Sequence, residues 1–212
     1  MRVDTWQDRW IGCVDDVVRV LLPKQALEVR PSPAARMTAV NLNPSERRHA
    51  AGLMRVNHSG EICAQALYQG QALVARSAQV RQALAQSAQE EADHLRWCQE
   101  RIQQLNSHTS YLSLIWYVGS LWIGIGAGLA GDAYSLGFLA ETEAQVTRHL
   151  NRHLDKLPAA DRLSRRIVEQ MSWDECQHQR VAEKMGAKPL PEWVKQLMNT
   201  CSKLMIWTAY RV

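Results

Sequence analysis

The sequence predicts an all-α protein, a four-helix bundle with additional amphipathic helices at its N- and C-terminal ends. Long stretches rich in Ala, Leu, Gln, Glu and Arg favour helix, and no convincing run of alternating β-branched residues indicates a strand. Only seven prolines and eleven glycines interrupt the 212 residues. The bundle follows from apolar residues at alternating spacings of four and three, the seam of a packed helix.

The composition excludes several classes of protein. Hydrophobic residues make up 46% and charged residues 22%, which is typical of a globular chain rather than a disordered one. The net charge is only +4, and no basic stripe is interleaved with aromatics, so we expect no nucleic-acid partner. Five scattered cysteines without a Cys-x-x-Cys pair favour reduced thiols over disulfides. The charged N-terminus is not that of a signal peptide.

Two units are expected: residues 1–43 as an N-terminal amphipathic helix and linker, and residues 44–212 as the helical bundle domain. Apolar residues at helical spacing predict the helix over 4–22, and three prolines indicate a linker over 23–43. The first bundle helix should begin with Asn43 as its cap and run to about residue 75.

Gly60 lies near the middle of that helix, directly before Glu61. A glycine in a helix interior costs about 1 kcal/mol relative to alanine. A close contact with another helix, or room for a ligand, could justify its presence.

Three further bundle helices are predicted over 78–106, 132–157 and 159–185. Asp132 is the expected cap of the second, and Gly186 is expected to end the third. A glutamate interrupts the apolar seam of each helix, and these residues are Glu91, Glu143 and Glu175. Because an unpaired buried carboxylate is expensive, each of them should be neutral or should have a cation as partner.

Two other segments raise the question of a membrane. Residues 102–131 contain no Asp, Glu, Lys or Arg, and the Trp- and Gly-rich part, 111–131, favours a buried or membrane-facing helix over a span. Residues 191–212 predict an amphipathic helix with a basic polar face. Lying on a membrane and docking on the bundle are equally compatible with it. The apolar face of this helix comprises Val194, Leu197, Met198, Cys201, Leu204 and Met205.

One pattern of potential metal ligands occurs twice, as Glu-x-x-His. Residues three apart lie on one face of a helix, so the carboxylate and the imidazole project together. A further glutamate precedes each copy by 30 or 32 residues. The six residues are Glu61, Glu91, His94, Glu143, Glu175 and His178.

These six side chains are the set with which four-helix bundles hold two iron or manganese ions. Four carboxylates balance the charge of two divalent cations, and carboxylate with imidazole suits redox-active iron better than a thiolate site would. Open coordination positions could then bind dioxygen. His149, six residues after Glu143, could border the site.

Four blocks of the sequence resemble the demethoxyubiquinone hydroxylases of ubiquinone biosynthesis. The likeness covers about residues 45–212 in matching order. The blocks are Leu53–Glu61 (LMRVNHSGE), Glu90–Leu95 (EEADHL), Glu141–Glu143 with His149, and Asp174–His178 (DECQH).

The resemblance implies a ferritin-like di-iron monooxygenase that hydroxylates the benzoquinol ring of a demethoxylated polyprenyl ubiquinone precursor. It implies that the six residues are catalytic iron ligands, with Glu91 and Glu175 as bridges, and that His149 borders the cofactor. Some members have tyrosine after that histidine, where this chain has Leu150.

The resemblance also implies the surroundings of the enzyme. It implies two iron ions per chain, dioxygen, and NADH as the electron source, although no Gly-x-Gly-x-x-Gly motif follows a strand. The expected partners are a membrane-embedded polyprenyl quinol, the membrane surface, and lipid-binding accessory proteins of ubiquinone biosynthesis. The expected location is the cytoplasmic face of the bacterial inner membrane, as a peripheral protein.

Other readings of the same residues stay open. A second ferritin-like di-iron protein would share the ligands, whether a peroxidase, a rubrerythrin-like electron carrier, or an iron store or assembly scaffold. A helical membrane-surface protein whose buried charges pair with arginines is a further alternative. The charge-free stretch and the amphipathic tail favour the hydroxylase over a peroxidase or an electron carrier.

Overall fold

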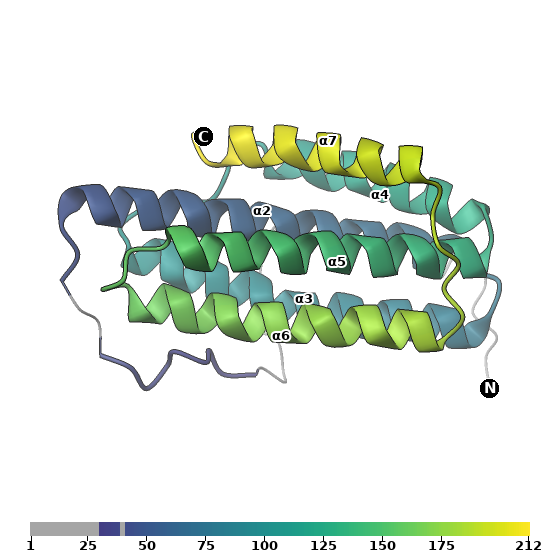
Figure 1. Cartoon of the computed structure of the whole chain (residues 1–212), viewed down its shortest axis with the longest axis horizontal. Helices are drawn as coiled ribbons and strands as arrows, with labels where there is room; N and C mark the ends of the chain where they lie inside the picture. The colour runs from purple at the N-terminus through teal and green to yellow at the C-terminus, as the bar shows by residue number, and fades with distance from the viewer. Residues whose placement is uncertain (1–29, 39–40) are drawn as a thin grey trace.

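The computed structural model describes residues 30–38 and 41–212, and this part of the chain forms six α-helices without a strand (Figure 1). The all-α prediction is confirmed, whereas the helix predicted over 4–22 lies outside the described residues. The helices are α2 (Pro44–Val74), α3 (Ala78–Gln104), α4 (Ser113–Leu129), α5 (Asp132–Lys156), α6 (Arg162–Lys184) and α7 (Glu192–Ala209).

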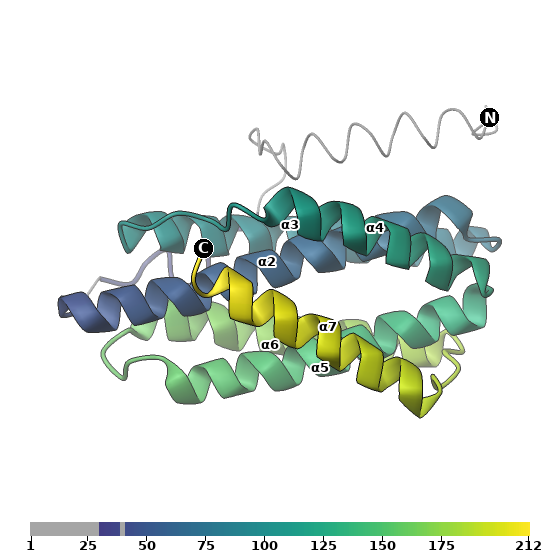
Figure 2. The ribbon, with the colours of Figure 1, turned by 90° about the horizontal axis from the view of Figure 1, so that it is seen from above.

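Four of these helices form the bundle. Helices α2 and α3 make one antiparallel hairpin, α5 and α6 make a second, and the two hairpins pack against each other (Figure 1). Helix α4 connects the hairpins and lies along α2, on the outside of the bundle. Helix α7 returns across α2 and α5 on the same side, so that α4 and α7 cover one face of the bundle (Figure 2).

The helix ends show which sequence signals decide the boundaries. The Asn43 side chain accepts hydrogen bonds from the backbone of Ser45 and Glu46, and the Glu46 carboxylate accepts one from the Asn43 backbone, which is a complete capping box. The prediction for Asp132 is wrong. Gly131, at φ 103°, is the residue before α5, and the Asp132 carboxylate instead accepts hydrogen bonds from backbone N–H groups at the start of α3.

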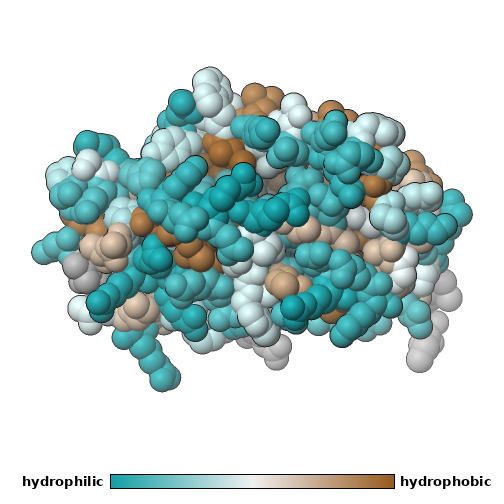
Figure 3. Space-filling view, viewed as in Figure 1, coloured by the Kyte–Doolittle hydropathy of each residue, from teal (hydrophilic) through white to brown (hydrophobic). Residues whose placement is uncertain are grey.

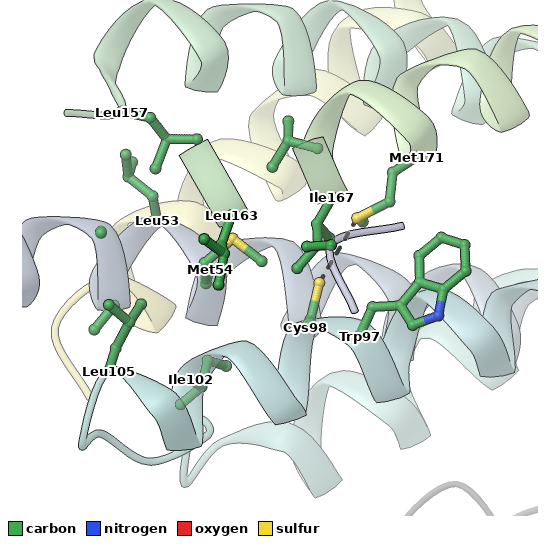
Figure 4. Close-up of a cluster of buried hydrophobic side chains, with 14 of the residues drawn as sticks. Leu53, Met54, Trp97, Cys98, Ile102, Leu105, Leu157, Leu163, Ile167 and Met171 are labelled. Atoms are coloured by element: carbon green, nitrogen blue, oxygen red, sulfur yellow. Dashed lines mark hydrogen bonds between the residues drawn. The ribbon is translucent and has the colours of Figure 1, made fainter. Parts of the chain in front are cut away.

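Two apolar clusters fill the two ends of the bundle. One contains Met54, Trp97, Cys98, Ile102 and Met171, with the Cys98 thiol 3.7 Å from the Met171 sulfur (Figure 4). The other is built around Leu67, Tyr68, Leu84, Leu136 and Leu139. On α2 and α3, the glutamates of the predicted site fall between the two clusters in sequence. The middle of the bundle is therefore polar and closed at both ends by apolar packing.

Helix α4 rests on α2 through glycines. A Cβ at Gly70 would lie 2.3 Å from the Leu121 carbonyl oxygen, and one at Gly124 would lie 2.2 Å from the Leu67 carbonyl oxygen. The two backbones therefore touch where any larger residue would separate them. Most bulky side chains of α4 point outward, with Ile115 63% and Trp122 64% exposed, whereas Tyr117 is fully buried against α2 and α3. The helix predicted to be buried or membrane-facing is thus buried along its glycine side and exposed along the other, and contact of the exposed side with a membrane stays a prediction.

Helix α7 docks on the bundle, with Met198 against one apolar cluster and Tyr210 against the other. The predicted apolar face is only partly covered, because Leu197 and Leu204 remain more than half exposed while Met198 packs inward. Hydrophobic residues accordingly show along the edge where α4 and α7 lie (Figure 3). Within the described residues, no helix has both the length and the apolar character needed to cross a membrane.

Candidate metal centre

The six predicted residues meet in the middle of the bundle, one position from each of α2 and α5 and two from each of α3 and α6. All are buried, with His178 the most exposed at 7%. They form two groups whose potential ligand atoms lie within 4.8 Å of one another. The group that we name the His94 position contains Glu61, Glu91, His94 and Glu175. The His178 position contains Glu91, Glu143, Glu175 and His178.

In the His94 position, the carboxylates surround one nitrogen of the imidazole. Nδ1 of His94 lies 3.2 Å from Oε2 of Glu91, 3.0 Å from Oε1 of Glu175 and 3.7 Å from Oε2 of Glu61. The Glu-x-x-His spacing explains the first contact, since Glu91 and His94 are three residues apart on α3. The other two glutamates come from α2 and α6.

The His178 position repeats this arrangement on the opposite hairpin. Nδ1 of His178 lies 3.2 Å from Oε2 of Glu175, 3.4 Å from Oε1 of Glu91 and 3.6 Å from Oε1 of Glu143. Glu91 and Glu175 therefore each direct one oxygen toward each histidine. This is the placement that carboxylates bridging two metal ions would have.

Burial and neighbouring groups shift the pKa values of Glu61, Glu91 and Glu143 in different directions. Burial, with Glu91 nearby, raises the pKa of Glu61 well above its ordinary value, and burial with the charge of Glu175 does the same for Glu143. Burial also works to raise the pKa of Glu91, but hydrogen bonds with Glu61 and both histidines together hold it below the ordinary value. Protons and divalent cations are thus alternative ways to neutralise the same buried acids.

The residues fit a metal centre on a separate observation. Oε2 of Glu143 is buried and has no hydrogen-bond partner among the described residues, and Oε1 of Glu91 and of Glu175, also buried, lie near a histidine Nδ1 without a hydrogen bond of good geometry. Buried acceptors without partners are costly, and coordination to a cation would satisfy them. A donor set of carboxylate oxygens and imidazole nitrogens suits iron or manganese.

A second carboxylate holds each histidine from outside the cluster. Nε2 of His94 lies 2.9 Å from Oδ2 of Asp174, and Nε2 of His178 lies 2.6 Å from Oε2 of Glu90. A proton on each Nε2 leaves the Nδ1 lone pair free for a metal. The bracing is reciprocal between α3 and α6, because Asp174 precedes Glu175 and Glu90 precedes Glu91. The prediction missed both acids, although an acid directly before each glutamate is a visible signal.

Tyr68 is a further residue that the sequence did not single out. Its hydroxyl donates a short hydrogen bond to Oε1 of Glu143, and the ring is fully buried. Burial, followed by the charge of Glu143, raises the pKa of this phenol well above its ordinary value, so the hydroxyl stays protonated and donates. Nothing in the helical periodicity of α2 marks Tyr68 as a residue of the site.

His149 lies in neither metal position. It lines a cavity of about 1120 Å³ between α2, α5 and α7, and its ring centroid is 3.9 Å from that of His153. Its Nε2 is buried and has no hydrogen-bond partner among the described residues. A role for His149 at the border of the cofactor stays a prediction.

Gly60 proves to have space around it. A Cβ at this position would have no heavy atom within 4 Å, so a close helix contact does not explain the glycine. Of the two explanations for Gly60, room next to Glu61 is the one that the packing leaves.

The fold and the cluster define a class: ferritin-like helical bundles whose buried glutamates and histidines can hold metal ions. Residues 48–209 match the family described as "Ubiquinone biosynthesis protein COQ7", and the chain belongs to this family.

Three relatives, each named 3-demethoxyubiquinol 3-hydroxylase, show how far the similarity extends. The chain is 50% identical to that of Legionella pneumophila (strain Corby) over 213 residues, which cover all of both chains. It is 54% identical to that of Stutzerimonas stutzeri (strain A1501) over 205 residues, 97% of this chain and 95% of the relative. It is 51% identical to that of Acinetobacter baumannii (strain ATCC 17978) over 210 residues, 99% of each.

Proposed function

We propose that this protein hydroxylates the benzoquinol ring of a demethoxylated polyprenyl ubiquinone precursor, as a di-iron monooxygenase. The observation that carries the proposal is the meeting of four buried glutamates and two buried histidines at one point of the bundle. The names of relatives about half identical over their full length support the substrate class.

The cofactors that we propose are two iron ions per chain, dioxygen as the oxygen donor and NADH as the electron source. When bound, iron supplies the redox chemistry of dioxygen activation. The protein's part is to place the ligands, to keep a proton on Nε2 of His94 and His178, and to exclude water. The apolar clusters at both ends of the bundle serve this last purpose.

We further propose that the substrate is a membrane-embedded polyprenyl quinol, approached from the cytoplasmic face of the bacterial inner membrane by a peripheral protein. The outward Trp122 on α4 and the outward Trp193, Leu204 and Trp207 on α7 are all more than half exposed, and they offer an apolar surface for a lipid. Lipid-binding accessory proteins of ubiquinone biosynthesis are proposed as further partners of this surface.

The test uses purified full-length protein loaded anaerobically with ferrous iron. Iron analysis should give two ions per chain. Addition of a short-tailed demethoxy quinol, NADH and ¹⁸O-labelled dioxygen should yield a hydroxylated quinol that carries one labelled oxygen. Iron far above two per chain would indicate a store instead. Fully loaded protein that makes no hydroxylated product with either NADH or a chemical reductant would overturn the proposal.

Location is tested separately, by flotation of the protein with vesicles of bacterial phospholipid. We expect it to float with them. A variant with Trp122 and Trp207 changed to Gln should lose flotation, and its unchanged metal content serves as the control for folding.

A further inference from the structure

Arg30 reaches the metal centre from outside the bundle. It stands in the described segment 30–38, before the first bundle helix, yet its side chain lies against α3 and α6. Its Nη2 donates to Oδ2 of Asp174 at 2.6 Å and its Nη1 donates to Oδ1 at 3.3 Å. The guanidinium thus grips both oxygens of one carboxylate, which fixes the orientation of that carboxylate as a single contact would not.

Arg30 is itself held on several sides. Its guanidinium lies 4.5 Å from the centroid of the Trp97 ring, and its carbonyl oxygen accepts hydrogen bonds from Nε1 of Trp97 and from Arg96. Its backbone N–H donates to Oδ1 of Asp93 at 3.3 Å. These contacts come from one turn of α3, the turn that carries His94. The arginine is therefore fixed in place even though its side chain is 40% exposed.

The grip on Asp174 continues to His94. Oδ2 of Asp174, the atom nearest Arg30, also accepts the hydrogen bond from Nε2 of His94 at 2.9 Å. His94 has no exposed surface, and Asp174 is 4% exposed. The direction of the imidazole therefore depends on a carboxylate whose own direction depends on Arg30. Nη2 of Arg30 also lies 3.3 Å from Nε2 of His94, so the arginine touches the imidazole as well.

We propose that Arg30 is a positioning residue for the His94 position: by holding Asp174 it aims Nδ1 of His94 at the metal, and it sets the affinity of that position alone. The proposal rests on the proposed metal centre. The segment 30–38, which precedes the bundle, thereby contributes a residue to the metal centre. Among the residues that the structure describes, the His178 position has no such grip, since the side chain of its outer acid, Glu90, is 40% exposed and accepts a hydrogen bond from Gln86.

Charge and positioning predict opposite results, which makes the proposal testable. Arg30 is a cation near a site for cations, so by Coulomb repulsion alone its removal should tighten metal binding. If its role is to position Asp174 and His94, its removal should weaken binding. Outer partners of metal-bound histidines typically contribute about 10- to 100-fold in affinity.

The experiment titrates metal-free, full-length protein with Mn²⁺ and Co²⁺ and follows calorimetry, Mn²⁺ paramagnetic resonance and Co²⁺ visible absorption. For Arg30→Ala, we expect one of the two equivalents to bind about 10- to 100-fold more weakly, with an altered Co²⁺ spectrum, while the other is unchanged. Arg30→Lys keeps the charge but not the two-pronged grip, and should be intermediate. Arg36→Ala removes an exposed arginine of the same segment and should bind both equivalents as the original chain does.

Asp174→Asn changes the residue between Arg30 and His94 and so tests the same contact. It also keeps the proposal testable if an Arg30 variant folds poorly. If Arg30 acts through Asp174, the double variant should lose no more affinity than Asp174→Asn alone. Unchanged or tighter binding in Arg30→Ala, equal weakening of both equivalents, or additive losses in the double variant would overturn the proposal. An original chain that binds no metal would instead remove the metal centre itself.

Discussion

The two metal positions use the same residue types, but their surroundings differ. At the His94 position the outer acid, Asp174, is 4% exposed and is held by Arg30 and Gln170. At the His178 position the outer acid, Glu90, is 40% exposed and is held by Gln86, one turn away on its own helix. Water can replace Glu90 in its role, whereas it cannot easily reach Asp174.

For the glutamate that belongs to only one position, Glu61 or Glu143, the His178 position is the better supported of the two. Tyr68 donates a hydrogen bond to Glu143, which belongs to the His178 position. Glu61, its counterpart in the His94 position, has its contacts within the cluster, with His94 and Glu91. One position is thus anchored through its histidine and the other through its glutamate. Ligand identity alone does not make two metal positions equivalent, and each anchor can be removed separately.

The largest effect is expected for Glu175→Ala, which should disable both metal positions because they share this residue. Neither metal should bind, and hydroxylation should be lost, since Glu91 alone would remain between the histidines. Iron analysis and the quinol assay measure both losses. Glu169→Ala, on the exposed side of the same helix, should keep two metals. Retained iron in Glu175→Ala would contradict the bridging placement.

Lowering the pH should weaken both positions steeply. The raised pKa values of Glu61 and Glu143 mean that each holds a proton in the metal-free protein well above the pH at which an ordinary glutamate loses it. Metal must displace these protons, so affinity should fall by about tenfold per pH unit for each proton displaced. Titrations at several pH values, with proton release followed in weak buffer, measure this. Affinity that does not change between pH 8 and pH 6 would refute it.

Tyr68→Phe should weaken the His178 position through its glutamate ligand, Glu143. It removes one buried hydrogen bond to a carboxylate, a loss of roughly 1.5 to 3 kcal/mol, and keeps the ring that packs in the apolar cluster. The His178 position should then bind metal about ten- to a hundredfold more weakly, with the His94 position unchanged. Tyr134→Phe, at an exposed site on α5, is the control. Loss at the His94 position instead would show that the two anchors are not independent.

Glu90→Gln should have the smallest effect. The amide oxygen can still accept the hydrogen bond from His178, and solvent reaches this side chain. A change of a few-fold in the affinity of the His178 position is expected, well below the change for Asp174→Asn at the other position. Glu100→Gln, at an exposed site on the same helix, provides the baseline. Equal losses from Glu90→Gln and Asp174→Asn would remove the asymmetry between the two positions.

Most of the fold and all six clustered residues could be predicted, because both depend on regular spacing along helices. Each Glu-x-x-His pair is local to one turn, and a glutamate in the middle of an apolar seam must face the centre of the bundle. Asp174 and Glu90 could have been predicted by the same reasoning, since each is adjacent to a ligand glutamate.

The residues that escaped prediction act across large sequence separations. Arg30 meets Asp174 across 144 positions, and Tyr68 meets Glu143 across 75. Neither contact produces a regular spacing in the sequence, because only the packing of the folded chain brings the partners together. The error at Asp132 has a similar cause: its carboxylate serves the start of α3, 55 residues away, rather than its own helix.

The glycine contact between α4 and α2 has a consequence for how the protein behaves in a test tube. A helix that sits on its neighbour through bare backbone needs few of its large side chains for attachment, and on α4 these are the buried Tyr117 and the partly buried Leu121. The exposed side chains of Ile115, Trp122 and Leu129 are therefore not needed for packing on α2, and they form an apolar outer surface. Changing them to polar residues should alter what the molecule sticks to, including detergent, column resin and other copies of itself, without altering its melting temperature.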